Sequence, residues 1–260
     1  MGRLIANYEH ARTLFDQLLT ADTRQRILLL EGVSGTGKTT LVNVCLESAA
    51  AVQCVPFSFR KTTITINEVF FRAGDKLGWE HFPHFLAKVD EMATTRVEIQ
   101  GNRQIGINHK IEVILAGEKI EDQDFQLAEL TKAWFSDLIN LPDNVLFVFD
   151  HYEDAPTALQ RWIGGPFLVR VPDAPQLRVL VAGQSVPDAD NIEWGGCCQG
   201  CKLTGVPEAR HWLPVAQALN RDVGEHDLLS VLHGACSALQ GRPDAIMNFI
   251  ANQLQAGPWR

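Results

Sequence analysis

Two kinds of hydrophobic pattern alternate along this chain. Uninterrupted apolar runs occupy 27–30 and 145–149, and 52–59 and 177–182 are two further strand candidates. Such runs are typical of a parallel sheet, because helices cover both faces of its strands. Segments with apolar residues every three or four positions predict helices over 3–20, 39–51, 66–77, 127–141 and 155–163. The alternation predicts an α/β fold with a parallel β-sheet flanked by helices.

Two segments depart from this alternation. Between 96 and 115, apolar residues stand mostly at alternate positions, with turn signals at Gly101-Asn102 and Asn108-His109, which predicts a small β-hairpin insertion. From 208 to 255 the spacing is helical, interrupted at Gly241-Arg242-Pro243, which predicts a C-terminal helical lid subdomain. We therefore expect an α/β core over 1–204 that carries the hairpin, and a helical subdomain over 205–260.

The composition is that of a globular protein, and the charge is acidic. The 260 residues are 46% hydrophobic and 21% charged, with a net charge of −8. Non-specific nucleic-acid binding requires clustered Lys and Arg, so we expect no nucleic-acid partner. No apolar stretch approaches the roughly 18 residues of a membrane span, and no secretory signal is recognisable, so we expect no membrane contact and a cytoplasmic location.

Three of the six cysteines lie close together. Cys197, Cys198 and Cys201 contain one Cys-x-x-Cys spacing, but a structural zinc site needs four ligands and no second pair follows. In a reducing cytoplasm we expect free thiols. A turn between two elements is therefore the expected structure here, with a metal site as the alternative.

One motif carries clear chemistry. Residues 32–39 read Gly-Val-Ser-Gly-Thr-Gly-Lys-Thr, which fits the phosphate-loop pattern G-x-x-x-x-G-K-[ST] and lies between a predicted strand and a predicted helix. Glycines let main-chain N–H groups converge on phosphates, Lys38 would bridge the β- and γ-phosphates, and the Thr39 hydroxyl would bind Mg²⁺. The residues expected to bind the nucleotide are Gly32, Ser34, Gly35, Thr36, Gly37, Lys38, Thr39 and Thr40.

The carboxylate partner of this loop should end another central strand. Asp150 directly follows 145–149, so we expect it to hold Mg²⁺ together with Thr39 and to be catalytic. Glu153 is the candidate base that orients the attacking water, with Asp154 as a helix cap or in the reverse role. Because a strand, helices and the insertion separate Lys38 from Asp150, we expect an extra strand between their two strands in the sheet.

These motifs, in this order, resemble the STAND class of AAA+-related signalling ATPases, which includes the NACHT and NB-ARC modules. Residues 26–32 are similar to the first strand of that class, 145–150 to its Walker B strand and 177–185 to its sensor strand. Gly241-Arg242-Pro243 is similar to its Gly-x-Pro element. The resemblance implies that Gln184 and Pro243 lie at the nucleotide.

Two positions depart from the class. Gln184 stands where the sensor arginine is expected, and His151 stands where related ATPases carry an acid. Loss of a charge at the γ-phosphate slows phosphoryl transfer, so we expect slow or no ATP hydrolysis. Arg161, Arg170 and Arg178 are the candidates for a compensating charge.

The resemblance implies a switch controlled by ATP and ADP with Mg²⁺, in signal transduction or bacterial-type conflict and defence. It also implies a protein effector or sensor in trans and a nucleotide-dependent oligomer. One alternative is a small-molecule kinase or metabolic ATPase, although no Asp-x-Asp follows a predicted central strand. Another is a degenerate nucleotide-binding scaffold for protein interaction, with the edge of the predicted hairpin as its surface.

Overall fold

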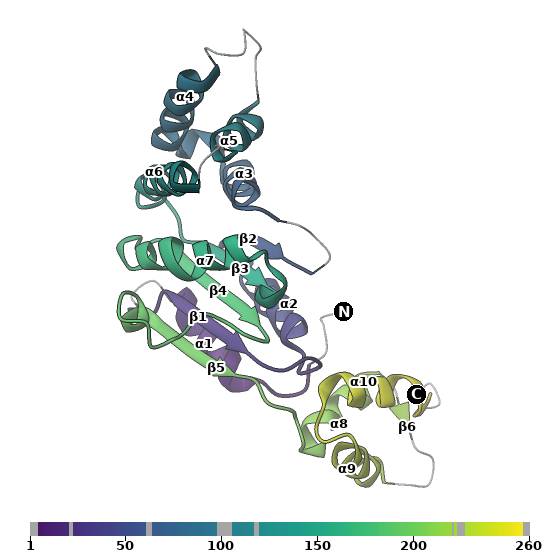
Figure 1. Ribbon diagram of the computed structural model, residues 1–260. Helices are drawn as coiled ribbons and strands as arrows, with labels where there is room; N and C mark the ends of the chain where they lie inside the picture. Colours follow the sequence, from purple (N-terminus) through teal and green to yellow (C-terminus); the bar gives the residue numbers. More distant parts are fainter. Residues whose placement is uncertain are drawn as a thin grey trace.

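Five parallel strands form the centre of the molecule (Figure 1). The structure is a computed structural model that describes residues 5–20, 23–60, 64–97, 106–116, 120–219, 221–222 and 227–256. The strands are β1 (Ile27–Glu31), β2 (Gln53–Ser58), β3 (Val145–Asp150), β4 (Leu177–Gly183) and β5 (Cys198–Lys202). Their order is β2-β3-β4-β1-β5, so β4 lies between β1 and β3. The predicted α/β fold and the extra strand between the two motif strands are confirmed.

Helices cover both faces of this sheet, which explains the uninterrupted apolar runs. Alternate strand residues such as Leu28, Leu30 and Val148 pack against α1 (Glu9–Leu19) and α2 (Lys38–Ser48). The residues between them, such as Leu29 and Phe147, face a larger cluster on the other side of the sheet. That cluster includes α7 (Thr157–Trp162) and the helical turns of Ile163–Phe167 and Leu168–Asp173.

A group of helices is inserted between β2 and β3, and we call it the helical insertion. It consists of α3 (Ile66–Leu77), α4 (Pro83–Val97), α5 (Ile107–Leu115) and α6 (Ile120–Leu138), stacked beyond β2 in Figure 1. Buried aromatic side chains join it to the sheet. Trp134 of α6 contacts Phe70 of α3 and Phe147 of β3, with ring centroids 5.0 and 5.6 Å apart.

The predicted hairpin over 96–115 is wrong. The chain is helical up to Val97 and again over Ile107–Leu115, while 98–105 lie outside the described residues. Some apolar residues at alternate positions have apolar neighbours in the sequence. Residues taken from both sets also fit the three- and four-residue spacing of a helix. Ile111 and Ile114 are the buried residues of α5, three positions apart as on one face of a helix.

The cysteine-rich segment is a strand rather than a turn. Cys198–Lys202 forms β5, which pairs with β1 at the edge of the sheet. An edge strand has one neighbour and need not be apolar throughout, so the polar residues Gln199 and Lys202 hid it from the hydrophobic pattern. Within the described residues, no group of three or more His, Cys, Asp or Glu side chains is arranged to hold a metal ion.

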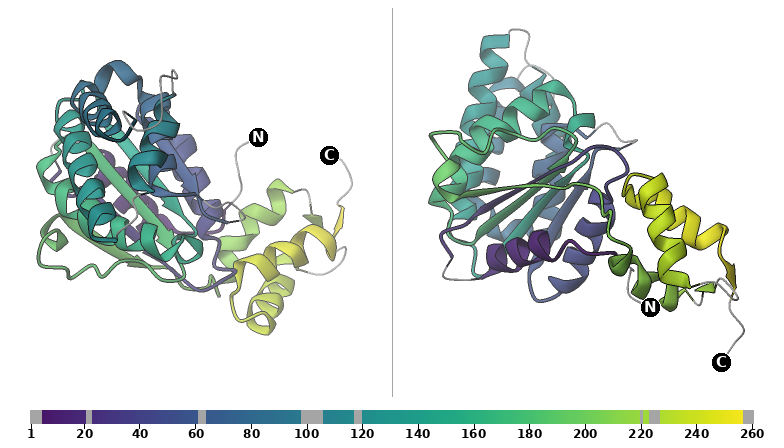
Figure 2. Two further views of the ribbon diagram at one scale, coloured as in Figure 1. Left: turned by 45° about the horizontal axis from the view of Figure 1, so that its top comes forward. Right: turned by 90° about the horizontal axis from the view of Figure 1, so that it is seen from below.

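The predicted C-terminal helices are present, and we call them the C-terminal cluster. They are α8 (Ala209–Ala218), α9 (Leu228–Ala238) and α10 (Pro243–Asn252), and Arg221–Asp222 (β6) pairs with Gln255–Ala256 (β7) beside them. The cluster lies at one end of the sheet, clear of its two faces (Figure 2). It has its own apolar core, which also takes in Ala6 from the N-terminal segment. The boundary at 204/205 stays a prediction. Among the described helices, none is long and apolar enough to cross a membrane.

Candidate functional site

The phosphate-loop motif forms the connection between β1 and α2. Gly35 and Gly37 have φ of +84° and +80°, a region that side chains with a Cβ rarely adopt. Gly32 is required because there is no room for a side chain: a Cβ there would lie 2.8 Å from Thr36 Oγ1 and 3.0 Å from Leu203 O. The loop leads directly into the N-terminus of α2. The amide N–H groups in the first turn of a helix have no intrahelical partners.

Lys38 is the buried cation of this loop. The residue is 8% exposed, and its ammonium donates hydrogen bonds to the carbonyls of Gly32 and, at 3.1 Å, Val33. Burial lowers the pKa of Lys38, whereas the nearby carboxylates of Glu153 and Asp150 act in the opposite direction. In this arrangement the ammonium is bonded to the loop's own carbonyls, and phosphate oxygens would replace these carbonyls as its charge-assisted partners.

Asp150 lies at the C-terminal end of β3, next to the end of β4 in the sheet. Its carboxylate is buried, and Oδ1 accepts a hydrogen bond of 3.0 Å from the amide of His151. The His151 ring connects it to the phosphate loop, with Nδ1 3.2 Å from Asp150 Oδ2 and Nε2 3.3 Å from Thr39 Oγ1. The same Nδ1 lies 3.3 Å from Ser58 Oγ at the end of β2. The ends of the two neighbouring strands β2 and β3, together with α2, thus bring these groups together.

Thr39 and Asp150 form an oxygen-donor set. A hydroxyl and a carboxylate lie on either side of one imidazole ring. Mg²⁺ prefers oxygen donors and usually keeps several waters beside one or two carboxylates and substrate phosphates. The two donors are of the type that Mg²⁺ prefers, but the His151 ring lies between them, so they cannot both bind one ion directly in this arrangement.

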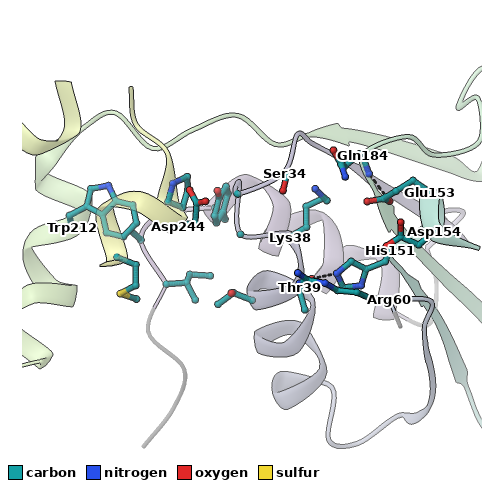
Figure 3. Close-up of a pocket in the computed structure, with 18 residues that line it drawn as sticks. Ser34, Lys38, Thr39, Arg60, His151, Glu153, Asp154, Gln184, Trp212 and Asp244 are labelled. Carbon is teal, nitrogen blue, oxygen red and sulfur yellow. Dashed lines mark hydrogen bonds between the residues drawn. The ribbon is translucent and has the colours of Figure 1, made fainter. Parts of the chain in front are cut away.

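Glu153 and Gln184 also meet at this end of the sheet. Glu153 Oε2 accepts a hydrogen bond of 2.8 Å from the amide of Gln184, drawn as a dashed line in Figure 3. A Cβ on Gly183 would lie 2.7 Å from the same oxygen, so the carboxylate packs closely on the end of β4. Helix α7 has Pro156 at its N-cap without a side-chain hydrogen bond, so the predicted capping role of Asp154 or Glu153 is wrong.

A cavity of about 490 Å³ connects these groups with the C-terminal cluster. This volume lies within the range of small-molecule and cofactor sites. Of the predicted site residues, it is lined by Ser34, Gly35, Gly37, Lys38, Thr39, Thr40, Glu153, Gln184 and Pro243. Gly32, Thr36 and Asp150 are not in its wall: the first two shape the loop, and Asp150 lies behind His151.

Several lining residues were not predicted from the sequence. Ile5, Ala6 and Tyr8 come from the segment before α1, and Trp212, Asp244 and Met247 come from α8 and α10. The Tyr8 hydroxyl donates to the carbonyl of Thr36, and burial raises the pKa of Tyr8 to about 12, so it is neutral at physiological pH. Asp244 directly follows the predicted Pro243, whereas no motif marks the other five, which the fold alone brings to the loop.

Arg60 is the arginine that lines the cavity. It lies two residues after the end of β2, beside Thr39 and His151 in Figure 3. The predicted compensating arginines do not line the cavity. Arg178 is buried and donates 2.7 Å to the carbonyl of Leu18 in α1, and Arg170 donates 2.8 Å to that of Pro166. Arg60 could have been found from its position after a strand, because such positions gather at the C-terminal edge of a parallel sheet.

No protein-family model matches the chain, and no curated protein sequence matches it. The chain is similar in structure to Cdc6p from Pyrobaculum aerophilum, with a TM-score of 0.49 and 14% identity over 93% of this chain and 60% of that one. It is also similar to the Orc1 protein of Aeropyrum pernix, solved in complex with DNA, with a TM-score of 0.49 and 15% identity over 99% of this chain and 64% of that one. The chain thus spans less than two thirds of either protein, and we base the function on the site itself.

Proposed function

We propose that the chain is an ATP- and ADP-binding P-loop NTPase module that acts as a nucleotide-dependent switch, with slow or no hydrolysis. The observation that carries this proposal is the wall of the cavity. One side is the phosphate loop, and the other belongs to α8 and α10. A nucleotide bound there contacts the sheet and the C-terminal cluster together, as a ligand must if it is to bias their arrangement.

The chemistry of the wall matches the parts of a nucleotide. Main-chain amides of the loop, the N-terminus of α2 and Lys38 would bind the phosphates, with the Thr40 hydroxyl beside them. With the His151 ring turned out from between them, Thr39 would ligate Mg²⁺ and Asp150 would hold it through water, and the bound ion would neutralise phosphate charge. Apolar side chains at the far end of the cavity would receive the base: Ile5, Ala6, Trp212 and Met247.

Slow hydrolysis is supported by how the polar groups are engaged. Glu153, the candidate base, already accepts a hydrogen bond from the Gln184 amide. Gln184 brings no positive charge to the phosphates, whereas an arginine in this role accelerates phosphoryl transfer by orders of magnitude. Arg60 is the side chain best placed to supply part of that charge.

The finer assignment to the STAND class is part of the proposal. It rests on the order of the phosphate loop, Asp150, Gln184 and Pro243, three of which line one cavity while Asp150 lies behind its wall. With it we propose a protein effector or sensor in trans and a nucleotide-dependent oligomer, in signal transduction or bacterial-type defence. The net charge of −8 gives no support to a nucleic-acid partner such as the DNA in the Aeropyrum pernix Orc1 complex.

The test is to denature the purified protein and identify released nucleotide by chromatography. We expect ADP or ATP from the wild type and none from Lys38→Ala, because loss of a charge-assisted hydrogen bond of up to about 3 kcal/mol weakens binding about 100-fold. Lys76→Ala removes an exposed lysine of α3 and is the matched control. Equal retention by Lys38→Ala and wild type would show that the site is wrong, and an empty wild type would favour a scaffold.

Phosphate release separates the switch from an enzyme with an acceptor. The switch predicts a slow rate that does not depend on added small molecules. Strong stimulation by a small acceptor would instead support a kinase.

A further inference from the structure

Asp244 packs directly on the phosphate loop. It is the second residue of α10, and its amide donates a hydrogen bond of 3.2 Å to the carbonyl of Gly35. A Cβ built on Gly35 would lie 2.7 Å from Cγ and from both carboxylate oxygens of Asp244. The carboxylate therefore covers Gly35 face-on, at the centre of the loop.

The position of this carboxylate is held by its own surroundings. Its Oδ1 accepts a hydrogen bond of 2.8 Å from the amide of Ala245, and Arg242 Nη2 lies 2.9 Å from Oδ2. Pro243 fixes the start of the helix and lies near Gly37, 3.8 Å from a Cβ built there. Asp244 thus reaches the loop through a helix start that has little freedom to turn it away.

A carboxylate at this place opposes the ligand that the loop attracts. The cavity already contains the acidic side chains of Glu153 and Asp154, against the cations Lys38 and Arg60. Phosphates bound by the loop amides would share this cavity with the charge of Asp244. Each added phosphate brings further negative charge, so the repulsion grows from a diphosphate to a triphosphate.

We propose that Asp244 sets the nucleotide preference of the site, and that it favours a nucleoside diphosphate over the corresponding triphosphate. The inference rests on the proposed function, since it concerns the same cavity. Asp244 is a specificity-determining residue: it contacts the loop that would bind the phosphates. Arg242 opposes it, because the ion pair neutralises part of its charge.

The size of the effect follows from distance and exposure. At an effective dielectric constant of about 20, two unit charges roughly 6 to 10 Å apart repel each other enough to change affinity about 10- to 100-fold. The Asp244 side chain is 48% exposed and paired with Arg242, so solvent and the ion pair reduce this effect. We therefore expect a discrimination of about tenfold.

The experiment measures dissociation constants for Mg·ADP and for a non-hydrolysable Mg·ATP analogue by calorimetric titration. Wild type binds the diphosphate more tightly. Asp244→Asn, which keeps the shape and the main-chain contacts, shifts the ratio of the two constants about tenfold toward the triphosphate. Arg242→Gln leaves the carboxylate unpaired and shifts the ratio in the opposite direction.

Glu208→Gln is the matched control, because it makes the same change in net charge on an exposed residue at the start of α8, outside the cavity. Its ratio stays at the wild-type value. Three results would overturn the inference and leave the proposed function standing. They are an unchanged ratio in Asp244→Asn, an equal shift of the ratio in Glu208→Gln, and a shift toward the triphosphate in Arg242→Gln. Failure of the wild type to bind either nucleotide overturns both.

Discussion

The helical insertion and the C-terminal cluster are both helical, but they join the sheet in opposite ways. The insertion shares one apolar core with the sheet, in which Trp134 contacts Phe70, Phe147 and Phe167. The C-terminal cluster has a core of its own and contacts the phosphate loop through Asp244, while Tyr8 of the N-terminal segment packs against that core and donates to the loop. A shared core resists separation, whereas a polar contact beside a cavity responds to what the cavity binds. The helical insertion therefore contributes to the stability of the sheet, whereas under the proposed function the C-terminal cluster would respond to the bound nucleotide.

The largest expected effect comes from removing the centre of the shared core. Trp134→Ala should lower the free energy of unfolding by about 4 kcal/mol, because a fully buried aromatic side chain leaves a cavity. Urea denaturation measures this change. Phe125→Ala removes an aromatic side chain on the same helix that is 66% exposed, and should cost less than about 0.5 kcal/mol. Equal effects of the two variants would contradict the shared core.

The polar anchor of the insertion comes next. Asp137 of α6 is buried and accepts hydrogen bonds from the start of α4, at 2.8 Å from the Phe85 amide and 2.6 Å from His84 Nδ1. Asp137→Asn should cost about 2 kcal/mol, since charge-assisted bonds to a helix N-terminus are lost. Asp143→Asn, in the exposed turn before β3, is the control. A loss no greater than that of the control would show that Asp137 is not an anchor.

At the cavity, Arg60→Ala should weaken nucleotide binding about tenfold without changing stability, because Arg60 is exposed and one charge-assisted contact is worth about 1.5 kcal/mol. Nucleotide titration measures the constant. Arg72→Ala, which breaks an exposed ion pair with Glu68 on α3, should leave binding unchanged. Arg60 would have no role at the phosphates if its variant bound like the control.

The smallest effect concerns the contact between the two parts of the molecule. Tyr8→Phe removes the hydroxyl that donates to Thr36, at a cost of about 1 kcal/mol. It should also speed proteolysis of the connection at 203–208, which links β5 to α8. Tyr152→Phe removes a comparable bond of 2.8 Å to Gln160 inside the α/β core. Tyr152→Phe should lower the free energy of unfolding by a similar amount without speeding cleavage at 203–208. Faster cleavage there in both variants would contradict the view that Tyr8 holds the C-terminal cluster against the phosphate loop.

The sequence predicted the parts whose pattern is local. Buried strands such as β1 and β3 must be apolar on both faces, and the phosphate loop needs its glycines in fixed places. What it missed depends on neighbours distant in the chain. β5 is polar because it lies at an edge, and α5 was mistaken for a hairpin because few residues of a short helix are buried. Arg60 follows a predicted strand and Asp244 follows the Gly-x-Pro element, but neither belongs to a motif, so its contact with the cavity emerges only from the fold.

The most direct test is hydrogen exchange of the wild-type protein with and without Mg·ADP. We expect slower exchange in three segments that line the cavity, namely the phosphate loop, residues 5–8 and the start of α10, and unchanged exchange in α4 and α6. Slowing confined to the helical insertion, or none at the phosphate loop, would contradict it.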